Sequence, residues 1–493
     1  MKTFLIRGVP EALQQDGWWL NAPPPQPPAR TAARGATQPP VWRAGLLLAL
    51  IALGDLLVWQ VAPGLSLAVF GAALVLAAIL AVEVTLSLRA QGQIAAGLTL
   101  ALCPLVELVQ PLSLLIAVLG ISAILVLIAG LRRGQLALGM LRLWPCGARQ
   151  GFADLRQGVG GRGDRDVSGS IGRAVLGWLM PVAMGLVFVW LLLIANPIAE
   201  QWLERFWDSD LKMPDPGRMI FWLCLAPVIW TALSIAQMRE RLAAAPRLAK
   251  AGPAPIGLIN PASVSRALVL FNAVFAVQTG LDVVYLYGGV GLPEGITYAE
   301  YAHRGAYPLV VTGLLAGGFA LLSRRWVQGS YMLRVLLMLF VAQNVALVIS
   351  SLVRLELYIE VYGLTRLRMA AAIWMGLTAS GLALILWQVW QGRDNHWLVL
   401  RGGALTAAVV YVCAFISFDA AIARYNLGHD VTPDRYYLCN LGDAAKPVIA
   451  AHDRNLCATR QMRIVAPDDW REWGFRNWRA RTSLAALDTG NRP

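Results

Sequence analysis

FNAVFAVQTGLDVVYLYGGVGLPEGITYAEYAHRGAYPLV, residues 271–310, is the stretch that decides the fold. It begins with an apolar helical pattern in which two polar side chains, Gln278 and Asp282, lie one turn apart on one face. A carboxylate inside an apolar run costs about 2.5–3.5 kcal/mol on insertion scales, so it is expected to face protein or water instead of lipid. The stretch therefore predicts a membrane helix that packs against other helices.

The second half of this stretch is polar and allows two interpretations. Thr297 and Glu300 have the spacing of a capping box, and Glu300 and Arg304 stand at i and i+4, where they can pair. The first interpretation is a well-capped interfacial helix. The second is a site at which four side chains join Asp282. Those four are Tyr298, Glu300, His303 and Arg304.

Composition places the chain in a membrane. Of its 493 residues, 57% are hydrophobic and 14% are charged, whereas a soluble domain carries about 25% charged residues. The formal net charge of +13 then marks cytoplasmic loops, because Lys and Arg accumulate on that side of membrane proteins. The lipid bilayer is the partner that composition implies, and no nucleic-acid partner is expected.

Apolar segments of transmembrane length recur along the chain, and a helix needs about 20 residues to cross the hydrocarbon. Eleven segments qualify: 43–62, 64–87, 92–110, 112–131, 172–195, 219–237, 264–288, 307–324, 331–353, 367–390 and 398–419. The expected fold is an all-α polytopic transmembrane helix bundle. Segments 132–171 and 238–263 are rich in arginine, as cytoplasmic loops are. Eleven spans then place the N-terminus inside and the C-terminus outside.

The same pattern divides the chain into five parts. They are a cytoplasmic segment with a Pro-rich linker (1–42), a four-span group (43–131), a basic cytoplasmic loop (132–171), a seven-span core (172–419) and an extracytoplasmic C-terminal domain (420–493). The basic loop is a candidate surface for a protein partner. In the C-terminal domain, Trp470, Trp473 and Trp478 are expected to form a small core, and the alternative is that they dock on lipid headgroups.

A second polar group lies in SLVRLELYIEVYGLTRLR, residues 351–368. Gln343, Arg354 and Tyr358 follow one helical stripe, and Arg366 comes after a glycine that can end the helix. This group allows either an interfacial aromatic belt with a paired arginine or an anion or headgroup site made by Arg354, Arg366 and Arg368. With eleven spans, Arg354 and Asp282 both lie near the outer ends of their helices, at one membrane level. The free-energy cost of burying an arginine and an aspartate there is much lower when they pair than when they are apart. We expect both polar groups to converge at the outer face, either as a latch between helices or as a binding site.

The two quoted stretches, together with RYNLG and YYLCNLGDAAKPVI within residues 424–449, have the pattern of a known family. They resemble the bacterial polytopic family called domain of unknown function 4173, a relative of domain of unknown function 4153. The resemblance covers residues 180–450. It implies a multi-pass protein of the bacterial inner membrane, and it implies no activity.

Cysteines and histidines are few and widely spaced. Cys439 and Cys457 are the pair in the polar C-terminal part, which would meet an oxidising compartment if it lies outside, so a disulfide between them is expected. A loop of this size is stabilised by about 3 kcal/mol in the chain-entropy model. No zinc spacing is present, and no histidine lies in the middle of an apolar run, so neither a metal nor a haem cofactor is expected.

Three classes of function are compatible with these features. Transport or handling of a small polar or anionic solute, or of a lipid, at the outer face is favoured by intramembrane polar residues such as Glu107 and Asp282. A membrane sensor, regulatory or scaffold role suits the polar outer domain and the basic inner loop. An enzyme acting on a lipid-linked substrate is favoured least, because no nucleophile or metal motif accompanies His303.

The charge pattern generates a test of topology. Cysteines introduced near Gly160 and near Asp443 should react with a membrane-impermeant thiol reagent from opposite sides of the membrane, because an odd number of spans separates them. Reaction of both cysteines from the same side would show that a span is miscounted.

Overall fold

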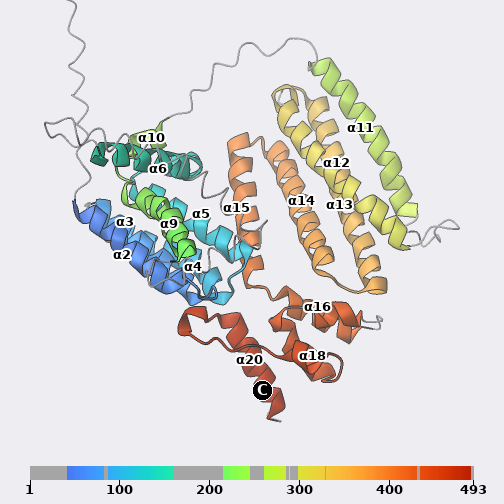
Figure 1. Cartoon of the computed structure of the whole chain (residues 1–493). Coiled ribbons are helices and arrows are strands. Elements are labelled where there is room, and N and C mark those ends of the chain that lie inside the picture. The colour runs from blue at the N-terminus through green and yellow to red at the C-terminus, as the bar shows by residue number, and fades with distance from the viewer. Residues whose placement is uncertain are drawn as a thin grey trace, which may run out of the picture. The chain divides into compact units, whose positions relative to one another are not determined.

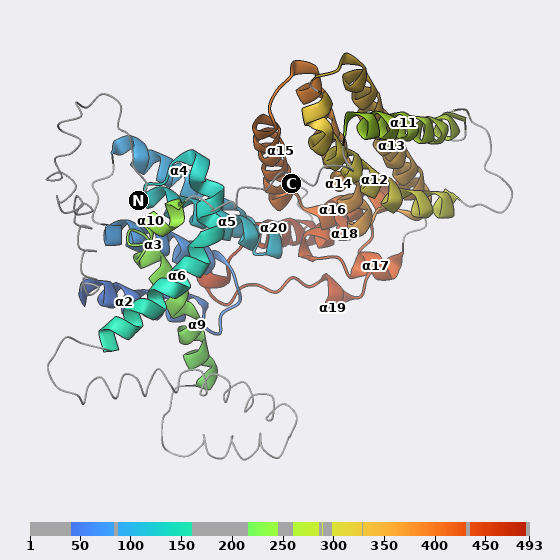
Figure 2. The same ribbon diagram turned by 90° about the horizontal axis from the view of Figure 1, so that it is seen from above.

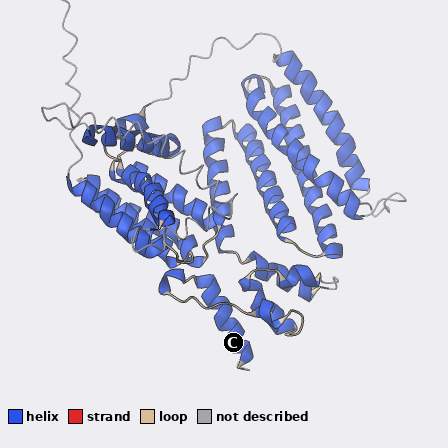
Figure 3. Ribbon diagram, viewed as in Figure 1, coloured by secondary structure: helices blue, strands red, loops and turns tan. Residues whose placement is uncertain are grey.

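The computed structural model describes residues 41–82, 87–159, 215–244, 260–284, 288, 298–327, 329–429 and 434–489. Within these ranges every regular element is a helix and none is a strand (Figure 1, Figure 3). The long helices are α2 (Val41–Val58), α3 (Leu65–Val82), α4 (Leu88–Glu107), α5 (Pro111–Ile128), α6 (Leu136–Val159), α9 (Pro216–Leu233), α11 (Pro261–Asp282), α12 (Tyr298–Val327), α13 (Tyr331–Tyr362), α14 (Arg366–Gln391) and α15 (Asn395–Phe415). Two short helical pieces, η2 (Arg133–Gln135) and α10 (Arg239–Ala243), lie at the starts of the two arginine-rich segments.

Seven of the described helices are long and apolar enough to cross a membrane: α3, α5, α9, α11, α13, α14 and α15. The chain is therefore an integral, multi-pass membrane protein, and the all-α helix bundle expected from the sequence is confirmed. Ten of the eleven expected spans coincide with a described helix, and the remaining one, 172–195, lies outside the described residues. The number of spans and their orientation stay predictions.

Helix ends follow local chemistry. The Asn260 side chain accepts a hydrogen bond from the Ser263 backbone N–H, and the Ser263 hydroxyl accepts one from the Asn260 N–H, so a reciprocal cap begins α11. Gly363 ends α13 with a φ of 74°, a conformation that side chains with a Cβ rarely adopt. Thr365 then caps the start of α14 by accepting from the Arg368 N–H. The turn between α13 and α14 is thus fixed by three consecutive residue types.

Contacts divide the chain into two units, of residues 1–52 with 144–234 and of residues 53–143 with 235–493. In the first unit, the later part of α6 packs on α9. The carboxylate of Asp154, which is buried, accepts from the Trp230 indole N–H at 3.0 Å and from the Gln150 amide at 2.8 Å. A Cβ at Gly147 would lie 2.1 Å from the Thr231 hydroxyl, so only glycine permits this close approach.

The second unit is organised around α13. This helix packs against α11, α12 and α14, and α14 packs on α15, so that α11 to α15 form one group (Figure 1, Figure 2). Its core contains Leu268, Leu337 and Val341, all almost fully buried, with Phe271 and Phe340 packed beside them at a ring-centroid distance of 5.5 Å. A second group joins α3, α4 and α5.

The C-terminal segment, residues 418–489, is a set of short helices. They are α16 (Phe418–Gly428), α17 (Arg435–Cys439), η4 (Asp443–Ala445), α18 (Lys446–His452), α19 (Thr459–Met462), η5 (Trp470–Glu472) and α20 (Phe475–Asp488). Their core consists of aliphatic side chains and one cysteine: Ile422, Ala423, Leu438, Leu441, Ala445, Ile449 and Cys457.

The expected tryptophan core of this segment is wrong. Trp470 and Trp478 are 57% and 43% exposed, and Trp473 is half-buried. The buried face of α20 is instead made by Arg476 and Ala480. Small aliphatic side chains fill the space between short helices at less steric cost than an indole ring does, and the tryptophans are left at the surface.

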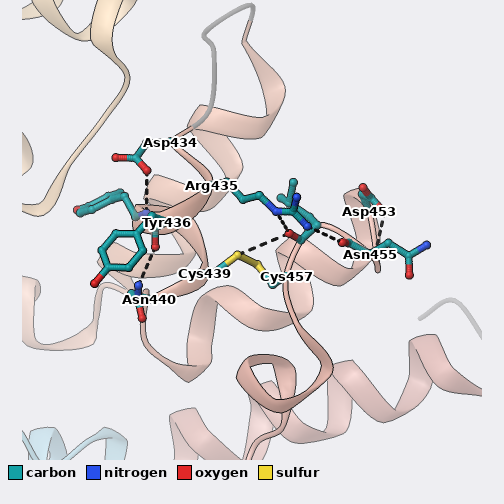
Figure 4. Close-up of a disulfide and its surroundings, with 10 residues drawn as sticks. Asp434, Arg435, Tyr436, Cys439, Asn440, Asp453, Asn455 and Cys457 are labelled. Atoms are coloured by element: carbon teal, nitrogen blue, oxygen red, sulfur yellow. Dashed lines mark hydrogen bonds between the residues drawn. A yellow bond between two sulfur atoms is a disulfide. The ribbon is translucent and has the colours of Figure 1, made fainter.

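A disulfide closes the segment between α17 and α19 (Figure 4). It joins Cys439, at the end of α17, to Cys457, with 5.6 Å between the two Cα atoms. The Arg435 guanidinium donates to the backbone carbonyls of Asn455, at 3.1 Å, and Leu456. The chain that leads into α19 is therefore held by one covalent bond and by one arginine.

The C-terminal segment contacts the ends of several long helices. The Leu65 N–H at the start of α3 donates to the Trp473 carbonyl at 2.8 Å, and the Asn426 amide bonds both to the N–H and to the carbonyl of Leu364 in the α13–α14 turn. A Cβ at Gly64 would lie 2.3 Å from the Glu472 backbone, so the chains touch there directly. The C-terminal segment therefore packs on the start of α3 and on the α13–α14 turn.

Candidate functional site

Asp282 and Arg354 form a buried ion pair between α11 and α13. Their side chains are 1% and 4% exposed, and the Arg354 guanidinium donates to Oδ1 of Asp282. The Gln278 amide donates to the same oxygen at 3.0 Å. Among the described residues, Oδ2 of Asp282 has no hydrogen-bond partner. Oδ1 therefore accepts two hydrogen bonds, whereas Oδ2 accepts none.

This pair is the end of a polar seam that continues along the same two helices. The Asn272 amide donates across to the Leu336 carbonyl of α13 at 3.0 Å, and the Gln343 amide donates back to the Asn272 carbonyl at 3.4 Å. Residue 272 of α11 bonds to residues 336 and 343 of α13, and residue 282 bonds to residue 354. The residue numbers rise together along both helices, so α11 and α13 run parallel. The seam fixes the register of the two helices.

A second ion pair lies where the C-terminal segment meets α14. Arg366 donates to both carboxylate oxygens of Asp419, at 2.6 and 2.7 Å, and the Gly442 N–H donates to Asp419 Oδ2 at 2.9 Å. The Arg366 N–H donates to the Tyr437 hydroxyl at 2.8 Å. Burial raises the pKa of Asp419, but the hydrogen bonds from Arg366 and Gly442 and the nearby positive charges outweigh it, so the pKa lies below its ordinary value.

A third ion pair joins α20 to the end of α4. Glu107 is 8% exposed and Arg476 is 5% exposed. Arg476 donates to the Glu107 carboxylate at 3.1 Å and to the Ala414 carbonyl at the end of α15 at 2.8 Å, and Arg479 approaches Glu107 to 3.5 Å. One arginine of the C-terminal segment therefore links the ends of two apolar helices.

A cavity of about 750 Å³ lies between the second and third ion pairs. We call it the α14–α15 cavity. Its apolar walls come mainly from α14 and α15, with Leu108 and Leu112 from the α4–α5 connection, and its polar end comes from the C-terminal segment and from Arg366 at the start of α14. The wall residues include Met369, Ala370, Ile373, Trp374, Leu377, Val409, Val410 and Cys413, and the polar end includes Arg366, Asp419, Asp443, Arg476 and Asn477.

The structure brings some of the predicted site residues together and separates others. Gln278, Asp282 and Arg354 meet, and Gln343 lies farther along their seam. Tyr358 packs under Arg368, whose guanidinium lies 4.2 Å from the ring centroid, and Arg366 pairs with Asp419 instead. Four predicted residues have backbones in α12 but side chains outside the described part of the chain: Tyr298, Glu300, His303 and Arg304.

Sequence reasoning missed the α14–α15 cavity and the partner of Glu107. The signal for Glu107 was its place at the end of an apolar helix, which requires a cation. Nothing in the spacing showed that the cation is Arg476, because 369 residues separate the two. Within the described ranges, no group of three or more His, Cys, Asp or Glu side chains is arranged to hold a metal ion.

The Asp282–Arg354 pair generates a stability prediction. D282N should lower the free energy of unfolding by about 3–5 kcal/mol, because it leaves the buried charge of Arg354 without a carboxylate. The double variant D282L/R354M removes both charges and should regain most of this loss. Thermal unfolding of the purified protein in detergent measures both effects. A D282N variant as stable as the parent would contradict the assignment of a buried pair.

The Asp419–Arg366 pair generates a pH prediction. Because the folded-state pKa of Asp419 is depressed, its stabilising contribution is present above the ordinary carboxyl pKa and is lost as pH falls through the lower, folded value. The stability difference between the parent and D419N should therefore shrink when thermal unfolding is measured at pH values falling below about 4. In the R366Q variant, which lacks the partner of Asp419, the stability change caused by D419N should depend less on pH. A constant difference between parent and D419N across this window would contradict the prediction.

Comparison with known proteins gives one match. The sequence model described as "Domain of unknown function (DUF4153)" matches residues 44–452. This family is the relative of domain of unknown function 4173, so the match supports the relative and not that name. The matched residues extend beyond the expected 180–450. No curated protein and no solved structure matches the chain. Since the match covers most of the chain, including α2 to α18, the protein belongs to the DUF4153 family.

Proposed function

We propose that this protein binds an anionic lipid, or a lipid-linked anionic molecule, in the α14–α15 cavity at the outer face of a bacterial cytoplasmic membrane. The observation that carries the proposal is the division of the cavity into apolar walls and a polar end with two arginines. An acyl chain suits the first part and a phosphate or carboxylate group suits the second. The volume of about 750 Å³ is within the usual range for ligand sites.

Both arginines retain a donor for an anion. Asp419 takes the Nε and Nη2 groups of Arg366, while Glu107 and the Ala414 carbonyl take those of Arg476. Within the described part of the chain, neither Nη1 group has a hydrogen-bond partner. Each guanidinium is thus held in place through two of its nitrogens and offers the third, which is the pre-organised arrangement that favours anion binding.

The helices that form the walls are among the least covered of the described spans, with α11 buried to the same extent as α14. Among the 18 most apolar consecutive residues of each helix, 17% are buried in α14 and 11% in α15, whereas 44% are buried in α13. Trp374, on the wall, is 52% exposed. A lipid can therefore reach the cavity sideways from the hydrocarbon.

The polar seam supports a structural role in place of a solute pathway. Asp282 is 1% exposed, its Oδ1 is bonded to two side chains, and it does not line the α14–α15 cavity. A solute pathway requires access to a polar group inside the span. We therefore assign the lipid rather than a small solute as the ligand, and the seam as the latch that holds α11 against α13.

Two bulky substitutions on α14 provide the test. Ala370→Trp fills the α14–α15 cavity, whereas Leu367→Trp is the matched control, because Leu367 is 67% exposed and does not line it. Both variants are reconstituted in nanodiscs that contain phosphatidylglycerol, and co-purified lipid is measured by native mass spectrometry. A370W should retain about tenfold less lipid, which corresponds to about 1.4 kcal/mol of binding free energy, because the indole takes the space of the acyl chain, while L367W should match the parent. Equal retention by all three proteins would overturn the proposal.

A further inference from the structure

We infer that the C-terminal segment holds a second binding site, specific for phosphate groups, in a pocket lined by four arginines. The pocket has a volume of about 700 Å³ and lies between α18, α19 and α20. We call it the arginine pocket. Its charged lining residues are Arg454, Arg460, Arg463, Arg481 and Asp488.

The charges in the pocket are not balanced. Arg454 pairs with the one acidic residue of the lining, Asp488, at 3.4 Å, and also donates to the Leu487 carbonyl. Among the described residues, no ion pair joins Arg460, Arg463 or Arg481 to an acidic side chain. The lining therefore carries an excess of positive charge, which attracts an anion.

Arg481 is the least exposed of the four arginines. Its Nε group is buried and, within the described part of the chain, has no hydrogen-bond partner. A buried N–H of a charged group without an acceptor costs more free energy than a neutral one does. An anion bound by the other nitrogens of Arg481 lowers the cost of its charge, and the planar fork of a guanidinium matches two oxygens of a phosphate.

The walls of the pocket are held in place by other contacts. Lys446 donates to the Arg463 carbonyl at 2.8 Å and fixes the chain after α19. The Cys439–Cys457 disulfide and Arg435 fix the chain before α19, which carries Thr459 and Arg460 (Figure 4). The arginines are thus presented from a braced frame, which lowers the cost of ordering them around an anion.

The shared chemistry is a phosphate group, which can belong to a lipid headgroup or to a soluble molecule. Thermal unfolding of the full-length protein separates the two sources. One arm adds inorganic pyrophosphate to the protein in neutral detergent, and the other compares nanodiscs of phosphatidylglycerol with nanodiscs of phosphatidylcholine. Stabilisation in the first arm assigns a soluble ligand, and stabilisation by phosphatidylglycerol alone assigns a headgroup.

The variants R463Q/R481Q and R460Q identify the site. Arg460 is exposed, so R460Q is expected to fold even if the double variant does not. Each should weaken binding of the stabilising anion by about tenfold or more, with a weaker dependence on salt. Arg424→Gln is the matched control, because Arg424 is an exposed arginine of α16 in the same segment and does not line the pocket. Absence of stabilisation in both arms, or equal stabilisation of R460Q and the parent, would overturn the inference.

Discussion

Glu107 is the last residue of the apolar helix α4, and its buried carboxylate needs a cation beside it. This need constrains how the rest of the second unit packs. Arg476 meets this need and at the same time binds the carbonyl that ends α15. A charge in the hydrocarbon region is tolerated only when protein satisfies it. The C-terminal segment is therefore an integral part of the second unit, because its Arg476 binds polar groups at the ends of α4 and α15.

The same constraint explains the polar seam between α11 and α13. Apolar helices in a bilayer gain little from the hydrophobic effect when they associate, so packing and hydrogen bonds must hold them together. Asn272 and Asp282 of α11 supply such bonds to α13, and Gln278 of the same helix donates to the Asp282 carboxylate. A buried ion pair adds little net stability compared with apolar residues of similar volume, but it penalises every register in which either charge lacks its partner. The seam thus contributes specificity of packing more than strength.

The part of this structure that could be predicted from the sequence rests on local or periodic information. Hydropathy located the helices, and Gly363 and Thr365 located the turn between α13 and α14. The meeting of Asp282 with Arg354 followed from one further step, because both were expected at one membrane depth. The partner of Glu107 could not be predicted, since depth alone does not choose among the many arginines of the chain. The tryptophan core failed for another reason: composition does not say which face of α20 is buried, and Arg476 and Ala480 occupy that face.

A single stripe of α20 connects the two ligand sites that we propose. Asn477 lines the α14–α15 cavity, and Arg481, Leu484 and Asp488 line the arginine pocket. These positions are spaced by four, three and four residues, so they lie on one face of the helix. A ligand in either site stabilises the folded form of the helix that the other site needs. Because Arg476 anchors the start of this helix on Glu107, ordering of α20 is the common requirement of both sites and of the ends of the helices beneath them.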